Sequence, residues 1–220
     1  MAGRNIPTNT LLAPKAPNLL LAPSTYAVSY QEQLNNTLRV YFNELDNVFS
    51  TLLNNSTGGA FIRLPYGAFQ DSTDQSATAN TATVVKLGTT DVSNGVSIVG
   101  GSKITVVTPG VYNLQFSGQF ENTDNASHDA SIWIRINGID VVGSNSIVGM
   151  SPRYSAGNYF HTIASWNYFI SMQATDYVEL WWSTDDTKVT LQAYAAGTSP
   201  TRPTTASVIA TLSFVSALTA

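Results

Sequence analysis

The chain has 220 residues, no cysteine, a formal net charge of −4 and a charged fraction of only 11%. This length allows one sizeable domain with an appendage. The lack of cysteine excludes disulfides, thiolate metal sites and cysteine nucleophiles. The acidic balance argues against a nucleic-acid partner, and no apolar run is long enough for insertion into a membrane. So few charges favour β-sheets with uncharged polar faces and stable assemblies.

The first segment, residues 1–28, is predicted to be an extended arm, because proline disfavours helix at its own position and before it. The motif Leu-Leu-Ala-Pro occurs at Leu11–Pro14 and again at Leu20–Pro23. Proline also interrupts every apolar run here, so we expect no signal peptide. The arm is either a free tail or an anchor that inserts leucines into another protein. The candidate anchor residues are Leu11, Leu12, Leu20 and Leu21.

Residues 29–55 are predicted to form a helical stalk, with the helix itself over Ser29–Leu53. Its apolar residues recur alternately four and three positions apart, the spacing with which one helix buries a seam against copies of itself. The seam residues are Leu34, Leu38, Tyr41, Leu45, Val48 and Leu52. A helix folded onto its own head domain is the alternative. Phe42 and Phe49 form a second apolar row beside the seam.

Residues 56–63 are predicted to be a hinge, and residues 64–220 a β domain. In the β domain the hydrophobic period becomes two, and turn residues such as Pro109-Gly110 and Asn137-Gly138 separate the runs. About ten short strands without crossover helices predict a β-sandwich or jelly roll. The predicted strands are Tyr66–Asp71, Thr81–Leu87, Val96–Val99, Lys103–Val107, Val111–Phe120, His128–Asn137, Tyr159–Met172, Asp176–Ser183, Lys188–Ala195 and Ala206–Val215.

The strand Asp176–Ser183 differs from the others because both of its faces carry large aromatic residues. Trp182 points to one side, while Tyr177, Glu179 and Trp181 point to the other. Trp181 either lies under a loop or contacts another subunit. Together with a self-associating stalk, this pattern favours Tyr177, Glu179 and Trp181 as a trimer interface of the head.

Three segments of the β domain resemble the trimeric jelly rolls of the C1q/TNF-like family. Gly110 to Phe116 (GVYNLQF) is similar to the Gly-x-Tyr-x-x-x-Phe strand of that family. Asp176 to Leu180 (DYVEL) resembles a later strand, and Val208 to Val215 the closing strand. The resemblance implies a compact β-sandwich in each subunit and a homotrimeric head.

Further phrases resemble C1q/TNF-like structural proteins of tailed bacteriophages. They are Ile132 to Gly138 (IWIRING), Asp176 to Thr184 (DYVELWWST) and Gly197 to Pro203 (GTSPTRP). Gln33 to Asn47 (QLNNTLRVYFNELDN) resembles a segment at the start of phage virion proteins. The resemblance implies a virion fibre, knob or decoration protein, assembled in the host cytoplasm. Its partners would be two copies of itself and, through residues 1–28, a capsid, adaptor or tail protein.

No catalytic, cofactor-binding or metal-binding motif is found, and we expect no enzyme activity and no cofactor. His128 and His161 are the only histidines, and no Gly-x-Ser-x-Gly turn places a nucleophile. Carboxylates such as Asp129 and Asp186 leave a polysaccharide depolymerase as the weaker alternative. A further alternative is a module that binds a host glycan or protein. Its candidate contact residues are Arg153, Tyr154 and Tyr159, in the polar stretch Ser151–Tyr159.

Overall fold

The computed structural model describes residues 14–53 and 64–218, and the side chains of 51–53 are outside this description. The chain divides into two compact units, Met1–Arg63 and Leu64–Ala220. The predicted hinge, residues 56–63, lies outside the described residues. Each unit is considered by itself.

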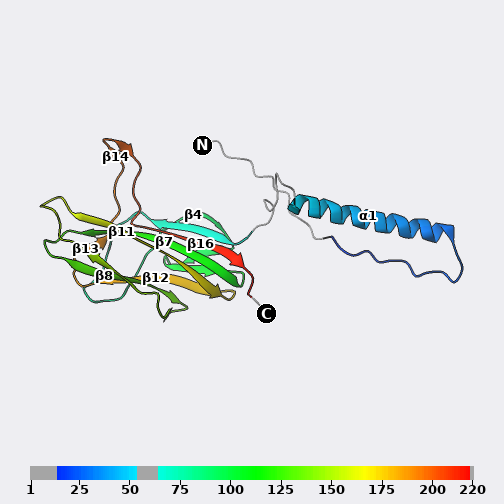
Figure 1. Ribbon diagram of the computed structural model, residues 1–220, viewed down its shortest axis with the longest axis horizontal. Helices are drawn as coiled ribbons and strands as arrows, with labels where there is room; N and C mark the ends of the chain where they lie inside the picture. The colour runs from blue at the N-terminus through cyan, green and yellow to red at the C-terminus, as the bar shows by residue number, and fades with distance from the viewer. Residues whose placement is uncertain (1–13, 54–63, 219–220) are drawn as a thin grey trace. The chain divides into compact units, whose positions relative to one another are not determined.

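The first unit contains one helix, α1 (Val28–Leu53), and an extended segment before it. The predicted helix is therefore confirmed, with its start one residue earlier. The extended segment runs back along the helix (Figure 1), where the Tyr30 hydroxyl donates a hydrogen bond of 3.2 Å to the carbonyl of Leu20. Lys15 and Pro17 line a shallow groove together with helix residues that include Val40 and Tyr41. The described part of the arm thus packs on its own helix.

The second unit is a sandwich of two antiparallel sheets of seven strands each (Figure 1). The first sheet has the order β11-β7-β16-β1-β4, and β13 and β2 continue it beside the end of β7. Its strands are β1 (Tyr66–Asp71), β2 (Gln75–Ser76), β4 (Thr89–Asn94), β7 (Gly110–Asn122), β11 (Phe160–Met172), β13 (Val189–Leu191) and β16 (Val208–Ser216).

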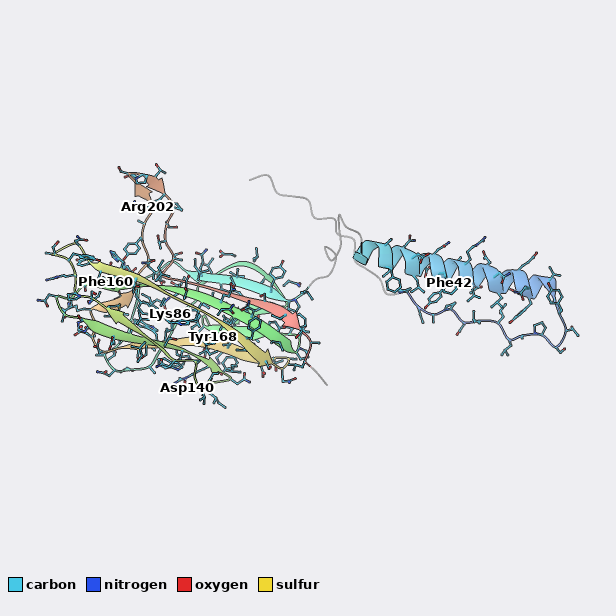
Figure 2. All side chains as sticks on the ribbon, viewed as in Figure 1. Phe42, Lys86, Asp140, Phe160, Tyr168 and Arg202 are labelled. Carbon is cyan, nitrogen blue, oxygen red and sulfur yellow. The ribbon has the colours of Figure 1, made fainter. Side chains whose placement is uncertain are left out.

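The second sheet has the order β10-β8-β12-β6-β5, with β9 beside β8 and β3 beside β12. Its strands are β3 (Thr83–Val84), β5 (Val96–Val99), β6 (Lys103–Val106), β8 (His128–Ile136), β9 (Ile139–Asp140), β10 (Ser146–Met150) and β12 (Tyr177–Thr184). A separate hairpin of β14 (Gly197–Thr198) and β15 (Thr201–Arg202) projects from the sandwich, and Figure 2 shows Arg202 on it.

The chain crosses repeatedly between the sheets, which is the jelly-roll arrangement. From β6 the chain passes to β7 in the first sheet, back to β8 and β10, and then through β11 and β12 to β16. The predicted fold class, a mainly β jelly-roll sandwich preceded by one helix, is confirmed. The apolar core between the sheets includes Phe69, Tyr112, Leu114, Phe120, Ile104, Ile134, Leu180 and Trp182, all at most 1% exposed.

Strand predictions succeeded where apolar alternation is strong and failed where it is weak. β1 and β5 have the predicted bounds, and β7, β8, β11, β12 and β16 lie within two residues of theirs. The predicted strand Thr81–Leu87 is wrong over most of its length, because only Thr83–Val84 pairs. The predicted strand Lys188–Ala195 is too long, because β13 covers only Val189–Leu191. The polar strand β4 and the strand β10 were not predicted.

One side-chain bond joins the two layers near the β9–β10 loop. Tyr168 on β11 stacks on Phe116 inside the sandwich, with 6.4 Å between the ring centroids. The Tyr168 hydroxyl donates a hydrogen bond of 2.7 Å to the carbonyl of Ser144. Ser144 is itself buried, and its hydroxyl donates to the carbonyl of Val141 and accepts from the backbone N–H of Ile134. This loop is therefore fixed against both sheets.

We predict that Ile104→Ala lowers the free energy of unfolding by about 2–5 kcal/mol, since it leaves a cavity in the core. Ile104 is fully buried, whereas its neighbour Thr105 points to the other face of β6 and is half-buried. The matched change Thr105→Ala should alter stability by no more than about 0.5 kcal/mol. Urea unfolding of both variants measures this difference. Equal losses of stability would contradict the assignment of Ile104 to the core face of β6 and Thr105 to its outer face.

Candidate functional site

The outer face of β7, β11 and β16 over residues 113–119, 163–171 and 209–215, here called the β11 face, has exposed apolar side chains and no Asp, Glu, Lys or Arg. The next outward residues of β7 and β11 are Glu121 and His161, which pair with each other at the border of this face. Ile163 is 64% exposed, Phe169 66% and Ile209 45%. Cross-strand pairing places the polar residues between them, with Asn113 beside Phe169 and Ser117 beside Ile209. The residues of the face are Asn113, Gln115, Ser117, Gln119, Ile163, Ser165, Asn167, Phe169, Ser171, Ile209, Thr211, Ser213 and Val215.

The β11 face is also hollowed. A depression of about 450 Å³ is lined by residues that include Gln115, Asn167 and Thr211, which form one cross-strand row. A second depression, of about 290 Å³, lies between Ile163 and Ile209. Exposed apolar residues on an uncharged, contoured surface are typical of a surface that another protein covers. This face was not predicted, because each of its strands alone reads as an ordinary half-buried strand.

The predicted head-interface residues lie on the other sheet, where each has a partner within the chain. The carboxylate of Glu179 is buried and accepts a hydrogen bond of 2.7 Å from the Ser102 hydroxyl. The guanidinium of Arg135 lies 3.8 Å from the ring centroid of Trp181, and the Lys103 ammonium lies 4.5 Å from that of Tyr177. Each of these cation–π contacts covers one face of its aromatic ring. A role at a subunit interface stays a prediction for these residues.

The described residues of the predicted seam, Leu34, Leu38, Tyr41, Leu45 and Val48, are each half-buried. In the described part of the chain α1 is the only helix, so no second helix covers them. Beside the seam, Phe42 is 57% exposed and Phe49 54%. The side chain of Leu52 lies outside the described residues.

Of the predicted anchor residues, Leu20 is 49% exposed and Leu21 is 96% exposed. Leu11 and Leu12 lie outside the described residues. The segment around Leu21 already packs on α1, but the Leu21 side chain itself does not. This side chain could therefore make an apolar contact with another protein. Anchoring to another protein stays a prediction for this segment.

The predicted receptor loop is only partly available for contact. Arg153 is held at the sandwich, because its backbone N–H donates to the carbonyl of Asp124 at 2.7 Å and its guanidinium to that of Thr123 at 3.2 Å. Tyr154 is 71% exposed, and its ring lies 6.3 Å from that of Phe160. Tyr159 is half-buried. Only Tyr154 presents a free aromatic surface in this loop.

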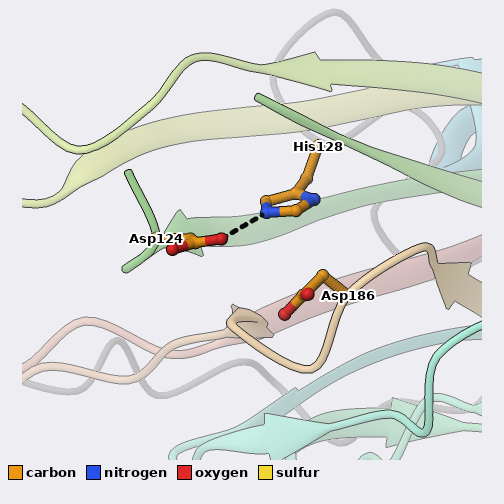
Figure 3. A group of neighbouring side chains, drawn as sticks. All are labelled: Asp124, His128 and Asp186. Atoms are coloured by element: carbon orange, nitrogen blue, oxygen red, sulfur yellow. Dashed lines mark hydrogen bonds and ion pairs between the residues drawn. The ribbon is translucent and has the colours of Figure 1, made fainter. Parts of the chain in front are cut away.

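His128 at the start of β8 is the centre of an ion-pair cluster at one end of the sandwich (Figure 3). Its Nε2 lies 3.0 Å from a carboxylate oxygen of Asp124, and its Nδ1 lies 3.1 Å from one of Asp185. Burial lowers the pKa of His128, but the hydrogen bond to Asp124 and the negative charges of Asp185 and Asp186 outweigh it. The net result is a raised pKa for His128 and a lowered pKa for Asp124.

The same residues include the one group in the described chain whose geometry could hold a metal ion. Asp124, His128 and Asp186 each offer a ligand atom, and these atoms lie within 4.8 Å of one another. However, both imidazole nitrogens face carboxylates, an arrangement that favours the doubly protonated ring, which has no lone pair for a metal. We therefore assign the cluster as an ion pair that joins the β7–β8 loop to the β12–β13 turn. The sequence did not indicate it, because the turn is distant along the chain.

A second histidine network holds the base of the projecting hairpin. The Tyr194 hydroxyl donates a hydrogen bond of 2.7 Å to the buried carboxylate of Glu121 and lies 2.8 Å from Nδ1 of His161. Burial and the Glu121 carboxylate strongly raise the pKa of Tyr194, so the phenol stays protonated. The network ties the segment that leads to β14 to strands β7 and β11.

We predict that His128 stabilises the head only while its ring is charged. Because its folded-state pKa is raised, its contribution is fully present below the unfolded pKa of about 6.5 and is lost as the pH rises through the folded pKa. Melting temperatures of wild type and His128→Gln, compared from acid to alkaline pH, should converge as the pH rises. In an Asp185→Asn background the convergence should occur at lower pH. A difference that does not depend on pH would contradict the assignment.

No helix in the described residues is long and apolar enough to cross a membrane. No protein-family model and no curated protein matches the chain. Among solved structures, the chain is similar to the globular domain of zebrafish complement 1qA protein, with 10% sequence identity and a TM-score of 0.41. The match covers 71% of this chain and all of that domain.

Proposed function

We propose that this chain is a non-enzymatic structural protein of a tailed-phage virion, a short homotrimeric fibre or knob. The β11 face is the observation that supports self-association most strongly, because Ile163, Phe169 and Ile209 are exposed there on a surface without formal charge. The half-buried seam of α1 supports it independently, since a short amphipathic helix needs a partner. The virion assignment and the number of three subunits rest on the resemblance of the sequence to trimeric phage proteins.

The β11 face supports a subunit contact better than the outer face of the second sheet. Its residues carry no formal charge, and the carboxylate at its border, that of Glu121, is already buried and accepts a hydrogen bond from Tyr194. Covering the face therefore adds little desolvation cost. On the second sheet, Arg135 and Asp140 form an ion pair and Arg135 also covers Trp181. Covering that surface would remove these charges from water. We therefore propose that the subunits of the head meet through the β11 face.

We expect Phe169→Asp to convert the trimer to monomers, because assembly would bury one unpaired carboxylate from each of the three subunits. Analytical ultracentrifugation should show the sedimenting mass fall from three chains to one, with an unchanged far-UV spectrum. Trp181→Asp is the matched control and should remain trimeric. The reverse pattern would move the interface to the second sheet, and a monomeric wild type would refute self-association.

The proposed attachment to the particle uses residues 1–28, where Leu20 and Leu21 are exposed. We expect Leu20→Ser with Leu21→Ser to reduce incorporation of the full-length protein into virions at least about tenfold, since two apolar contacts of roughly 1 kcal/mol each are lost. Immunoblots of purified particles measure incorporation. The control is Val142→Ser, a fully exposed apolar residue on the head. Equal incorporation of both variants would refute anchoring by these leucines.

A module that binds a host glycan or protein is the second candidate function, supported by the exposed aromatic ring of Tyr154. A polysaccharide depolymerase has less support. Asp124 and Asp185 are both engaged with His128, and Asp186 accepts a hydrogen bond from the backbone N–H of Lys188. These contacts leave the three carboxylates poorly placed to act as a free acid and base pair.

A further inference from the structure

The outer face of the second sheet carries a depression that none of the functions above uses. Its volume is about 350 Å³, near the lower limit for small-ligand sites. It lies between β8, the end of β12 and the β9–β10 loop, and Figure 2 shows Asp140 on the outside of the sandwich there. The residues that line it are Ser131, Trp133, Asp140, Val141, Gly143, Asn145 and Ser183.

The polar groups of the depression are held in place by the protein. The indole N–H of Trp133 donates a hydrogen bond of 2.7 Å to Asp140 Oδ1, and the Nε–H of Arg135 donates to the same oxygen at 2.5 Å. These are the hydrogen bonds that the described chain makes to this carboxylate, so Oδ2 remains available to a ligand. Hydrogen bonding from Arg135 and Trp133 lowers the pKa of Asp140, which keeps it an acceptor.

The side of the depression formed by the β9–β10 loop is also fixed. Ser144, which lies between the lining residues Gly143 and Asn145, is buried and bonded to β8 and to Tyr168. Ser131 and Ser183 are directly paired across β8 and β12, so their hydroxyls lie side by side. The site therefore has an aromatic side and a rim of hydroxyl, amide and carboxylate groups without rearrangement.

This lining selects one class of small ligand. It contains no Lys or Arg, so phosphates and carboxylates have no cation there except Arg135, which is already paired with Asp140. It is too polar and shallow for an acyl chain. A pyranose ring has the complementary surface, because its C–H face packs on an indole and its hydroxyls both donate and accept hydrogen bonds.

We propose that this depression binds one pyranose ring of a neutral saccharide, with Trp133 under the ring and Asp140, Asn145, Ser131 and Ser183 at its hydroxyls. The proposal stands on the depression alone and does not depend on self-association. It places glycan contact on the second sheet and not in the loop that contains Tyr154. Because the β11 face belongs to the other sheet, a trimer formed there would leave three such sites open, and multivalency would strengthen weak binding to a polymer.

The test titrates the full-length protein with methyl β-glucopyranoside, methyl β-galactopyranoside, methyl α-mannopyranoside and N-acetylglucosamine. Saturation-transfer-difference NMR and tryptophan fluorescence report binding. At least one sugar should bind saturably with a Kd on the order of 1 mM, as expected for a small shallow site. Trp133→Leu should raise that Kd at least about tenfold, and Asn145→Ala about 2- to 10-fold for one lost hydrogen bond.

Trp181→Leu is the matched control, because Trp181 pairs with Trp133 across the strands but does not line the depression. It should leave the Kd unchanged. Asn145 is exposed, so its variant keeps the test informative if Trp133→Leu fails to fold. Saturation by none of the four sugars, or an unchanged Kd in both Trp133→Leu and Asn145→Ala, would overturn the proposal. The proposal would also be overturned if a protein partner covered Trp133 and none of the four sugars competed with that partner for binding.

Discussion

The head depends on the alternation of side chains along β7. This strand pairs with β11 along its whole length on one edge, and with β16 and then β13 on the other. Tyr112, Leu114 and Phe116 therefore point into the core, and every intervening residue points out of the sandwich. A shift of one residue in its register would expose the aromatic core and bury a row of amides. The core and the β11 face are two results of one alternating pattern.

The sequence was sufficient to predict the elements with strong periodicity. The heptad spacing predicted α1, and alternation of large and polar residues predicted β7, β8 and β12. β4 and β10 were missed because the first is polar at five of its six positions and the second is short and contains a glycine. For such strands, pairing with a neighbour decides the structure, and a single sequence does not contain that information.

Candidate sites were harder to predict, because they form between segments that are distant in sequence. The aromatic character of both faces of β12 was evident, but the guanidinium that covers Trp181 comes from β8. Likewise, His128 and Asp124 are close in sequence, whereas Asp185 reaches them from the turn after β12. The two outer faces of the sandwich consequently differ in chemistry. One has amides and isolated apolar groups, and the other has the Arg135–Asp140 ion pair, whose guanidinium lies over the indoles of Trp133 and Trp181.

The bond from Tyr168 to Ser144 has a mechanical consequence. Tyr168 belongs to the edge strand of the first sheet, whereas Ser144 lies in the loop that walls the depression on the second sheet. A force that pulls this loop outward must either break the bond or draw β11 with it. Since Tyr168 also stacks on Phe116 at the centre of the sandwich, the load passes into the core. The loop is thus braced against tension by the opposite layer.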